Sequence, residues 1–219
     1  REIAARFSTQ SEIGNDAWEP GDEWIDLRTR HKVDLMYRTP LWIEDQMDRV
    51  LIRHEASLGY STTFWHNVLH SVPLFDPNGW YRNLQESANR PYPDPLKHAI
   101  VAKNHPLLRE AMSSYLSQIR TAVARSDGVS VQHRVTALLS SYFDILFAVN
   151  ELPHPGEKRQ LQIVVDGGLV MPPGMPDRIN DLLRAGIGSA VVIHTDALID
   201  GLDELLEAEG LRASVDQEL

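Results

Sequence analysis

Asp34 is the residue whose type and surroundings point most directly to chemistry. It stands in the run Val33-Asp34-Leu35-Met36, an apolar segment that predicts a β-strand. A carboxylate in an apolar strand is rarely buried without a cation or a hydrogen-bonding partner. The alternative interpretation is an Asp34 side chain that points to solvent, because successive side chains of a strand lie on opposite faces. Asp34 is therefore a candidate metal ligand.

A second candidate is the cation pair Lys158 and Arg159, which follows the helix-breaking dipeptide Pro155-Gly156. These breakers predict that one helix ends and another starts, with both cations on the first turn of the new helix. Cations there oppose the helix dipole unless an anion joins them, and the free amides of a helix N-terminus favour phosphate. The alternative is a solvated pair at a turn.

Two histidines, His66 and His70, have the spacing that places both imidazoles on one helix face. This is the spacing of a zinc-protease helix, but that chemistry needs a glutamate directly after the first histidine, and Asn67 stands there. We therefore favour ordinary helix-face histidines over a zinc site.

The elements that must position these residues change in type along the chain. Residues 1–38 carry strand signals, with a turn at residues 19–22 and a hairpin loop at residues 28–32. From Thr39 onward, apolar residues recur at three- and four-residue steps, which predicts helices. After the helix that starts at Thr39-Pro40, helices are expected at 61–70, 80–88, 96–103, 106–125, 129–150, 177–185, 188–200 and 201–210.

The proline-rich stretch at residues 91–95 interrupts this helical pattern, because proline cannot continue a helix and restricts the residue before it. We place a domain boundary there, with an α/β portion over residues 1–90 and a helical portion over residues 91–219. The expected fold class is α+β, with a partial sheet at the N-terminus followed by a mainly α-helical bundle.

Composition limits the classes of function. The 219 residues are 42% hydrophobic and 24% charged, as in an ordinary globular protein, and the net charge of −10 argues against a general nucleic-acid binder. The chain has no cysteine, which excludes disulfides and thiolate metal sites and suggests a cytoplasmic location. No apolar run approaches the ~20 residues that span a bilayer, so no membrane partner is expected.

Two segments give the chain a wider resemblance. The Val33-Asp34 strand resembles the last catalytic strand of the nucleotidyltransferase superfamily, and residues 141–159 resemble the uncharacterised helical domain that follows bacterial nucleotidyltransferase domains. The similarity extends over about residues 22–165. It implies that Asp34 is a metal-binding carboxylate for Mg²⁺ and that Lys158 and Arg159 contact the phosphates of a nucleoside triphosphate. The implied reaction passes a nucleoside monophosphate to a hydroxyl of a small molecule or a protein.

The family's Gly-Ser turn and the Asp-x-Asp pair that follows it are absent from these 219 residues. We therefore expect a piece of a longer protein that is folded but inactive alone, because two Mg²⁺ ions need at least three carboxylates. The open edge of the partial sheet further predicts that the chain associates into a homo-oligomer or aggregates. The alternative from another class is a non-catalytic nucleotide-binding or protein-interaction module with the same fold.

Overall fold

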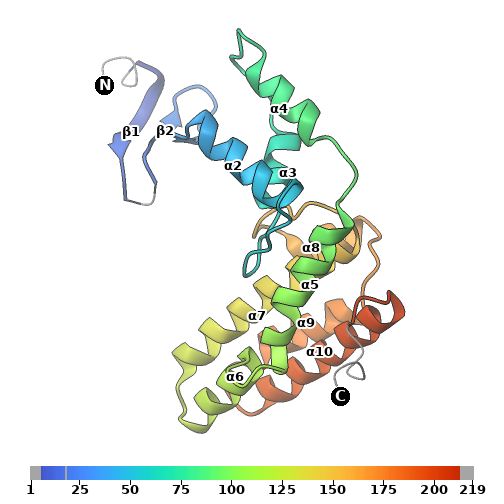
Figure 1. The fold of residues 1–219 in the computed structure, drawn as a ribbon. Coiled ribbons are helices and arrows are strands. Elements are labelled where there is room, and N and C mark those ends of the chain that lie inside the picture. The colour runs from blue at the N-terminus through green and yellow to red at the C-terminus, as the bar shows by residue number, and fades with distance from the viewer. Residues whose placement is uncertain (1–5, 18, 213–219) are drawn as a thin grey trace. The chain divides into compact units, whose positions relative to one another are not determined.

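The computed structural model describes residues 6–17 and 19–212, and it confirms the α+β fold class (Figure 1). A three-stranded antiparallel sheet comes first and helices follow. The chain forms two compact units, residues 1–45 and residues 46–219. The proline-rich stretch at residues 91–95 lies inside the second unit, and the domain division at residue 90 stays a prediction.

The sheet of the first unit is a meander in the order β1-β2-β3, made of β1 (Ser8–Asn15), β2 (Gly21–Asp26) and β3 (Lys32–Met36). The predicted hairpin loop connects β2 to β3. Its turn is stabilised by the Asp26 carboxylate, which accepts hydrogen bonds from the Thr29 amide at 2.7 Å and the Thr29 hydroxyl at 2.8 Å. Asp26 is therefore a turn-stabilising residue.

The sheet is built without a buried apolar core of its own. Among the described residues of the first unit, every apolar side chain larger than alanine remains half-buried or exposed, and Met36 and Phe7 are 60% and 62% exposed. A sheet of this size normally needs a covered apolar face to be stable. The first unit therefore leaves apolar surface available to other elements.

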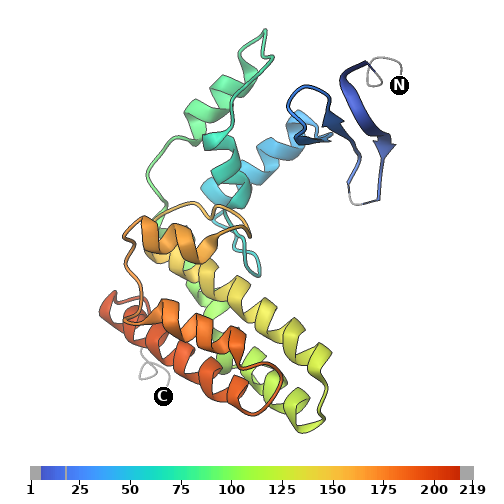
Figure 2. The same cartoon turned by 180° about the vertical axis from the view of Figure 1, so that it is seen from behind.

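The second unit is a helical bundle (Figures 1 and 2). Its longest helix, α7, presents the broad apolar surface that the sequence predicts, and Tyr142, Ile145 and Leu146 on it are fully buried. The helices are α2 (Pro40–Leu51, which begins in the first unit), α3 (Thr63–His70), α4 (Trp80–Ala88), α5 (Asp94–Arg109), α6 (Tyr115–Ala124), α7 (Gly128–Val149), α8 (Gln160–Asp166), α9 (Met175–Arg184) and α10 (Ala190–Ala208).

The predicted helix start at Pro106 is wrong, because α5 continues through this proline to Arg109. A proline inside a helix removes one backbone hydrogen bond. Burial of Val101 and Leu108, on either side of Pro106, favours the continuous helix. The next helix starts at Tyr115, where the Ser114 hydroxyl caps it by accepting from the Ser117 amide.

The predicted break before Gly201 is also wrong, because α10 is one helix from Ala190 to Ala208. A side chain at position 201 would place its Cβ 3.1 Å from both Pro172 and Arg178, so the glycine allows close packing. Across residues 6–17 and 19–212, no helix combines the length and the apolar character needed to cross a membrane.

Candidate functional site

Asp34 lies in β3, as the sequence predicts, but on an open surface. Half of its side chain is exposed, and the Lys32 ammonium lies 3.1 Å from its Oδ1. The same ammonium lies 2.8 Å from Oε2 of Glu23 on β2. Lys32 therefore forms ion pairs with both carboxylates at the surface, and the alternative of a solvent-facing Asp34 agrees with this geometry.

A row of carboxylates crosses the sheet at this position. Glu12 on β1 is opposite Glu23, and Glu23 is opposite Asp34. Directly opposite residues in antiparallel strands project from the same face, so all three acidic side chains share one face. Only the last two of them contact Lys32.

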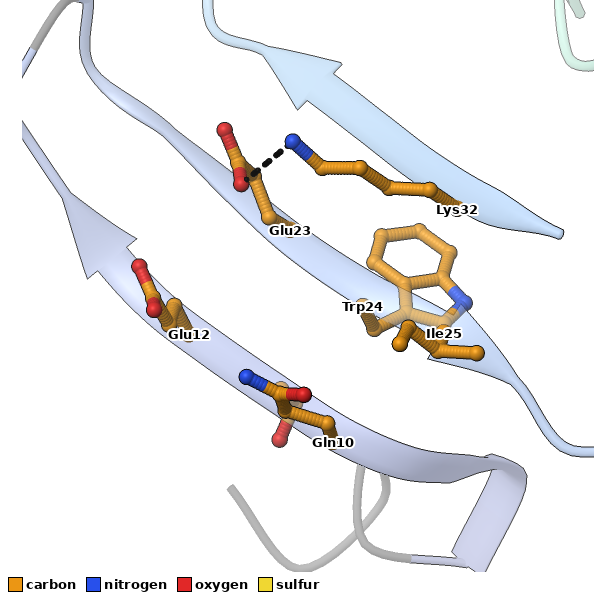
Figure 3. Close-up of a pocket in the computed structure, with 7 residues that line it drawn as sticks. Gln10, Glu12, Glu23, Trp24, Ile25 and Lys32 are labelled. Atoms are coloured by element: carbon orange, nitrogen blue, oxygen red, sulfur yellow. Dashed lines mark ion pairs between the residues drawn. The ribbon is translucent and has the colours of Figure 1, made fainter. Parts of the chain in front are cut away.

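Two shallow hollows border this row. One of about 250 Å³ is lined by Gln10, Ser11, Glu12, Glu23, Trp24, Ile25 and Lys32, and Figure 3 shows the Glu23–Lys32 ion pair beside it. The second, of about 210 Å³, is lined by residues that include Asp22, Glu23, Asp34 and Met36. Asp34 therefore borders a concave surface that a small ligand can reach.

The carboxylates fit Mg²⁺ only in part. Mg²⁺ is usually held by one or two carboxylates together with substrate phosphates, so Asp34 and Glu23 are sufficient in number for one ion. A site that holds two Mg²⁺ ions for an in-line displacement needs more carboxylates than these two. In the part of the chain that the structure describes, no three acidic or histidine side chains gather closely enough to hold an ion. The described residues therefore do not complete a two-ion site.

Lys158 and Arg159 lie in the turn before α8, and their predicted place on its first turn is wrong. Arg159 has a left-handed backbone conformation with φ of 58°, which is incompatible with the helix, so α8 begins at Gln160. Both side chains are exposed. This arrangement agrees with the alternative of a solvated pair. The two cations belong to the second unit, whereas Asp34 belongs to the first.

A buried carboxylate that sequence reasoning did not select, Asp144, forms a polar centre inside the second unit. It is 1% exposed on α7 and accepts hydrogen bonds from the Ser61 amide at 2.9 Å and the Ser61 hydroxyl at 2.6 Å. The Asn104 amide donates to it at 3.3 Å, and the Asn104 oxygen accepts from the Gly59 amide at 3.0 Å. Burial raises the pKa of Asp144 to about 6.

His154 is buried beside this centre. Its Nδ1 accepts a hydrogen bond from the Gly156 amide at 3.0 Å, so the neutral ring carries its proton on Nε2. Burial, together with the nearby His66, lowers the pKa of His154 to about 4. His66 and His70 stack with ring centroids 4.0 Å apart. Among the described residues, no third histidine or acidic side chain gathers with this pair.

A second buried network joins α5 to α10. His105 Nε2 lies 2.5 Å from Asp203 Oδ1, and both side chains are buried. Arg109 contacts the same carboxylate and also donates to Asp200 at 2.5 Å. The network has the geometry of a structural clamp. The sequence signal for it was a row of acidic residues along α10 at helical spacing.

Asp144 also left a sequence signal, because it interrupts the apolar surface of the central helix between Phe143 and Ile145. A charged residue inside such a stripe predicts a buried partner, but the partners Ser61 and Asn104 lie far away in the sequence.

Comparison with protein-family models, curated proteins and solved structures found no match to this chain.

Proposed function

We propose that this chain is part of a nucleotidyltransferase-like protein, which transfers a nucleoside monophosphate from a nucleoside triphosphate to a hydroxyl of a small molecule or a protein. In this proposal Asp34 contributes one carboxylate to Mg²⁺, and Lys158 and Arg159 contact phosphate. The remaining carboxylates come from outside the described residues. This chain alone is then expected to bind nucleotide weakly and to transfer nothing.

The observation that supports the proposal is the position of Asp34. Its carboxylate is opposite Glu23 on one face of an antiparallel sheet and borders a concave surface. Carboxylate oxygens are the ligands that Mg²⁺ prefers, and Mg²⁺ bound to a triphosphate already has phosphate ligands. One or two carboxylates at the sheet can therefore add contacts to such a complex.

A specific observation favours a second candidate, a non-catalytic nucleotide-binding or protein-interaction module. The Lys32 ammonium lies between the Glu23 and Asp34 carboxylates, at 2.8 Å and 3.1 Å. A cationic side chain in this place neutralises the charge that would otherwise attract a metal ion. This module would bind its ligand without Mg²⁺.

The test is isothermal titration calorimetry of the 219-residue chain with each of the four nucleoside triphosphates, with Mg²⁺ and with EDTA. The proposal predicts binding that requires Mg²⁺ and that Asp34→Asn weakens at least about tenfold, on the scale of one charged contact. Replacing both Lys158 and Arg159 with alanine should weaken binding by ~1–3 kcal/mol and reduce its salt dependence.

Asp166→Asn is the matched control, because Asp166 is an exposed aspartate at the end of α8 and has no assigned role. It should leave binding unchanged. An affinity for nucleotide that neither EDTA nor the Asp34→Asn substitution changes would favour the non-catalytic module. Absence of binding under every condition would refute the nucleotidyltransferase proposal and the nucleotide-binding form of the module, and release of labelled pyrophosphate by the chain alone would contradict the expected inactivity.

A further inference from the structure

The outer edge of β3 carries backbone groups that point away from the sheet. The Asp26 amide donates to the His31 carbonyl and the Tyr37 amide donates to the Pro20 carbonyl, so residues 31 and 37 face β2. Antiparallel ladders alternate along each strand. The backbone N–H and C=O groups of Lys32, Asp34 and Met36 therefore face outward.

This edge is regular and exposed. The pairing of β3 with β2 has no register shift, whereas the pairing of β1 with β2 is irregular at two places. Irregularities of this kind protect the edge of a sheet, because they bend the strand and disturb further pairing. Lys32, Asp34 and Met36 are all exposed, so β3 is the edge on which another strand can add.

The charges on this edge are self-complementary. Lys32 and Asp34 flank Val33, so an antiparallel copy of the same strand, centred on Val33, brings each lysine opposite an aspartate. Because both residues have outward backbone groups, each such pair also exchanges two backbone hydrogen bonds. We propose that β3 pairs with β3 of a second copy of this chain, which joins two three-stranded sheets into one sheet of six strands.

The neighbouring registers are less favourable. Moving the centre to Lys32 places the two lysines opposite each other, and moving it to Asp34 places the two aspartates opposite each other. Like charges directly opposite across two strands are destabilising, whereas opposite charges are stabilising. The charge pattern therefore selects the register centred on Val33 and gives the dimer a two-fold axis there.

The register centred on Val33 pairs residues 32–34 of each copy, which are three of the five residues of β3. The strand is short and the interface is small, so we expect a reversible dimer whose population rises with protein concentration. Its charge pairs are exposed, so salt should weaken it.

The test is sedimentation velocity of the 219-residue chain from about 5 µM to about 500 µM, the range expected for a small interface. The proposal predicts a monomer–dimer equilibrium. It depends on neither nucleotide binding nor catalysis. A monomer at every concentration, or assembly beyond the dimer, would overturn it.

Charge reversal tests the register. Asp34→Lys and Lys32→Glu each create two like-charge pairs and should weaken the dimer about tenfold or more. The double variant Lys32→Glu/Asp34→Lys exchanges the charges and should restore the dimer. An equal mixture of the two single variants should also associate, because the two positive residues of one chain then meet the two negative residues of the other.

Matched controls change the same charges elsewhere. Lys103→Glu alters an exposed position on α5, and Glu12→Lys alters the other edge strand, so both should leave the dimer unchanged. Circular dichroism of each variant checks that it keeps its fold. A dimer that survives Asp34→Lys, or one that the double exchange does not restore, would disprove pairing through β3.

Discussion

Ser61 and Asp144 are joined by two hydrogen bonds although 83 positions separate them in the sequence. The serine donates both its amide and its hydroxyl, so the carboxylate on α7 anchors the segment that leads into α3. His154 lies near the same segment, because its amide donates to the Thr62 hydroxyl at 2.7 Å. One buried acid thus contacts Ser61, and one buried histidine contacts Thr62.

These two groups should oppose each other in the pH dependence of stability. The pKa of Asp144 is about 6 in the folded protein and 3.8 ordinarily, so between these values the folded state keeps a proton that the unfolded state loses. Its contribution to stability therefore decreases as pH rises from 4 to 6. The pKa of His154 is about 4 instead of 6.5, so its contribution increases over nearly the same range.

We predict that Asp144→Asn makes the stability rise more steeply with pH between 4 and 6, by up to about 1.4 kcal/mol per pH unit. His154→Asn should have the opposite effect. The measurement is urea unfolding at half-unit pH steps. The slopes of the free energy of unfolding against pH are compared, so that a constant loss of stability in either variant cancels. Parallel curves for the wild type and both variants would contradict the assignment.

Gly59 should tolerate alanine much less well than Gly79. Both have positive φ, 73° and 70°, so both variants carry the cost of a left-handed residue, about 1 kcal/mol. Only at Gly59 does the new Cβ collide, 2.9 Å from the Cβ of Ser140. We expect Gly59→Ala to lose a further ~1–3 kcal/mol in urea unfolding. Equal losses of stability in the two variants would show that Ser140 on α7 moves aside at little cost.

The clamp between α5 and α10 should depend on the buried aspartate and much less on the exposed one. Asp203→Asn weakens contacts to both His105 and Arg109 inside the protein and should cost about 1–3 kcal/mol. Asp200→Asn removes one exposed contact to Arg109 and should cost less than about 1 kcal/mol. Thermal unfolding at neutral pH compares the two variants. A larger loss for Asp200→Asn would argue against the clamp.

The sequence predicted the local elements well where a local cause exists. The apolar period and the turn residues around Trp80–Ala88 predicted that helix at its observed bounds, and the strand signals predicted a hairpin loop at residues 28–32, one residue from its observed place between β2 and β3. The sequence was misleading at Pro106, Gly201 and Arg159. At these positions helix continuation or termination depends on packing and on a left-handed backbone angle, which one residue type does not reveal.

The candidate residues divide in the same way. That Asp34 lies in a strand followed from its apolar neighbours, because strand formation depends on nearby residues. That it is exposed beside Lys32 and opposite Glu23 followed only from the register of the sheet. The partners of Asp144 and of Asp203 come from positions far away along the chain. Burial and pairing of charges are properties of the packed chain, so the sequence determined which residues could do chemistry and the tertiary structure decided what each one meets.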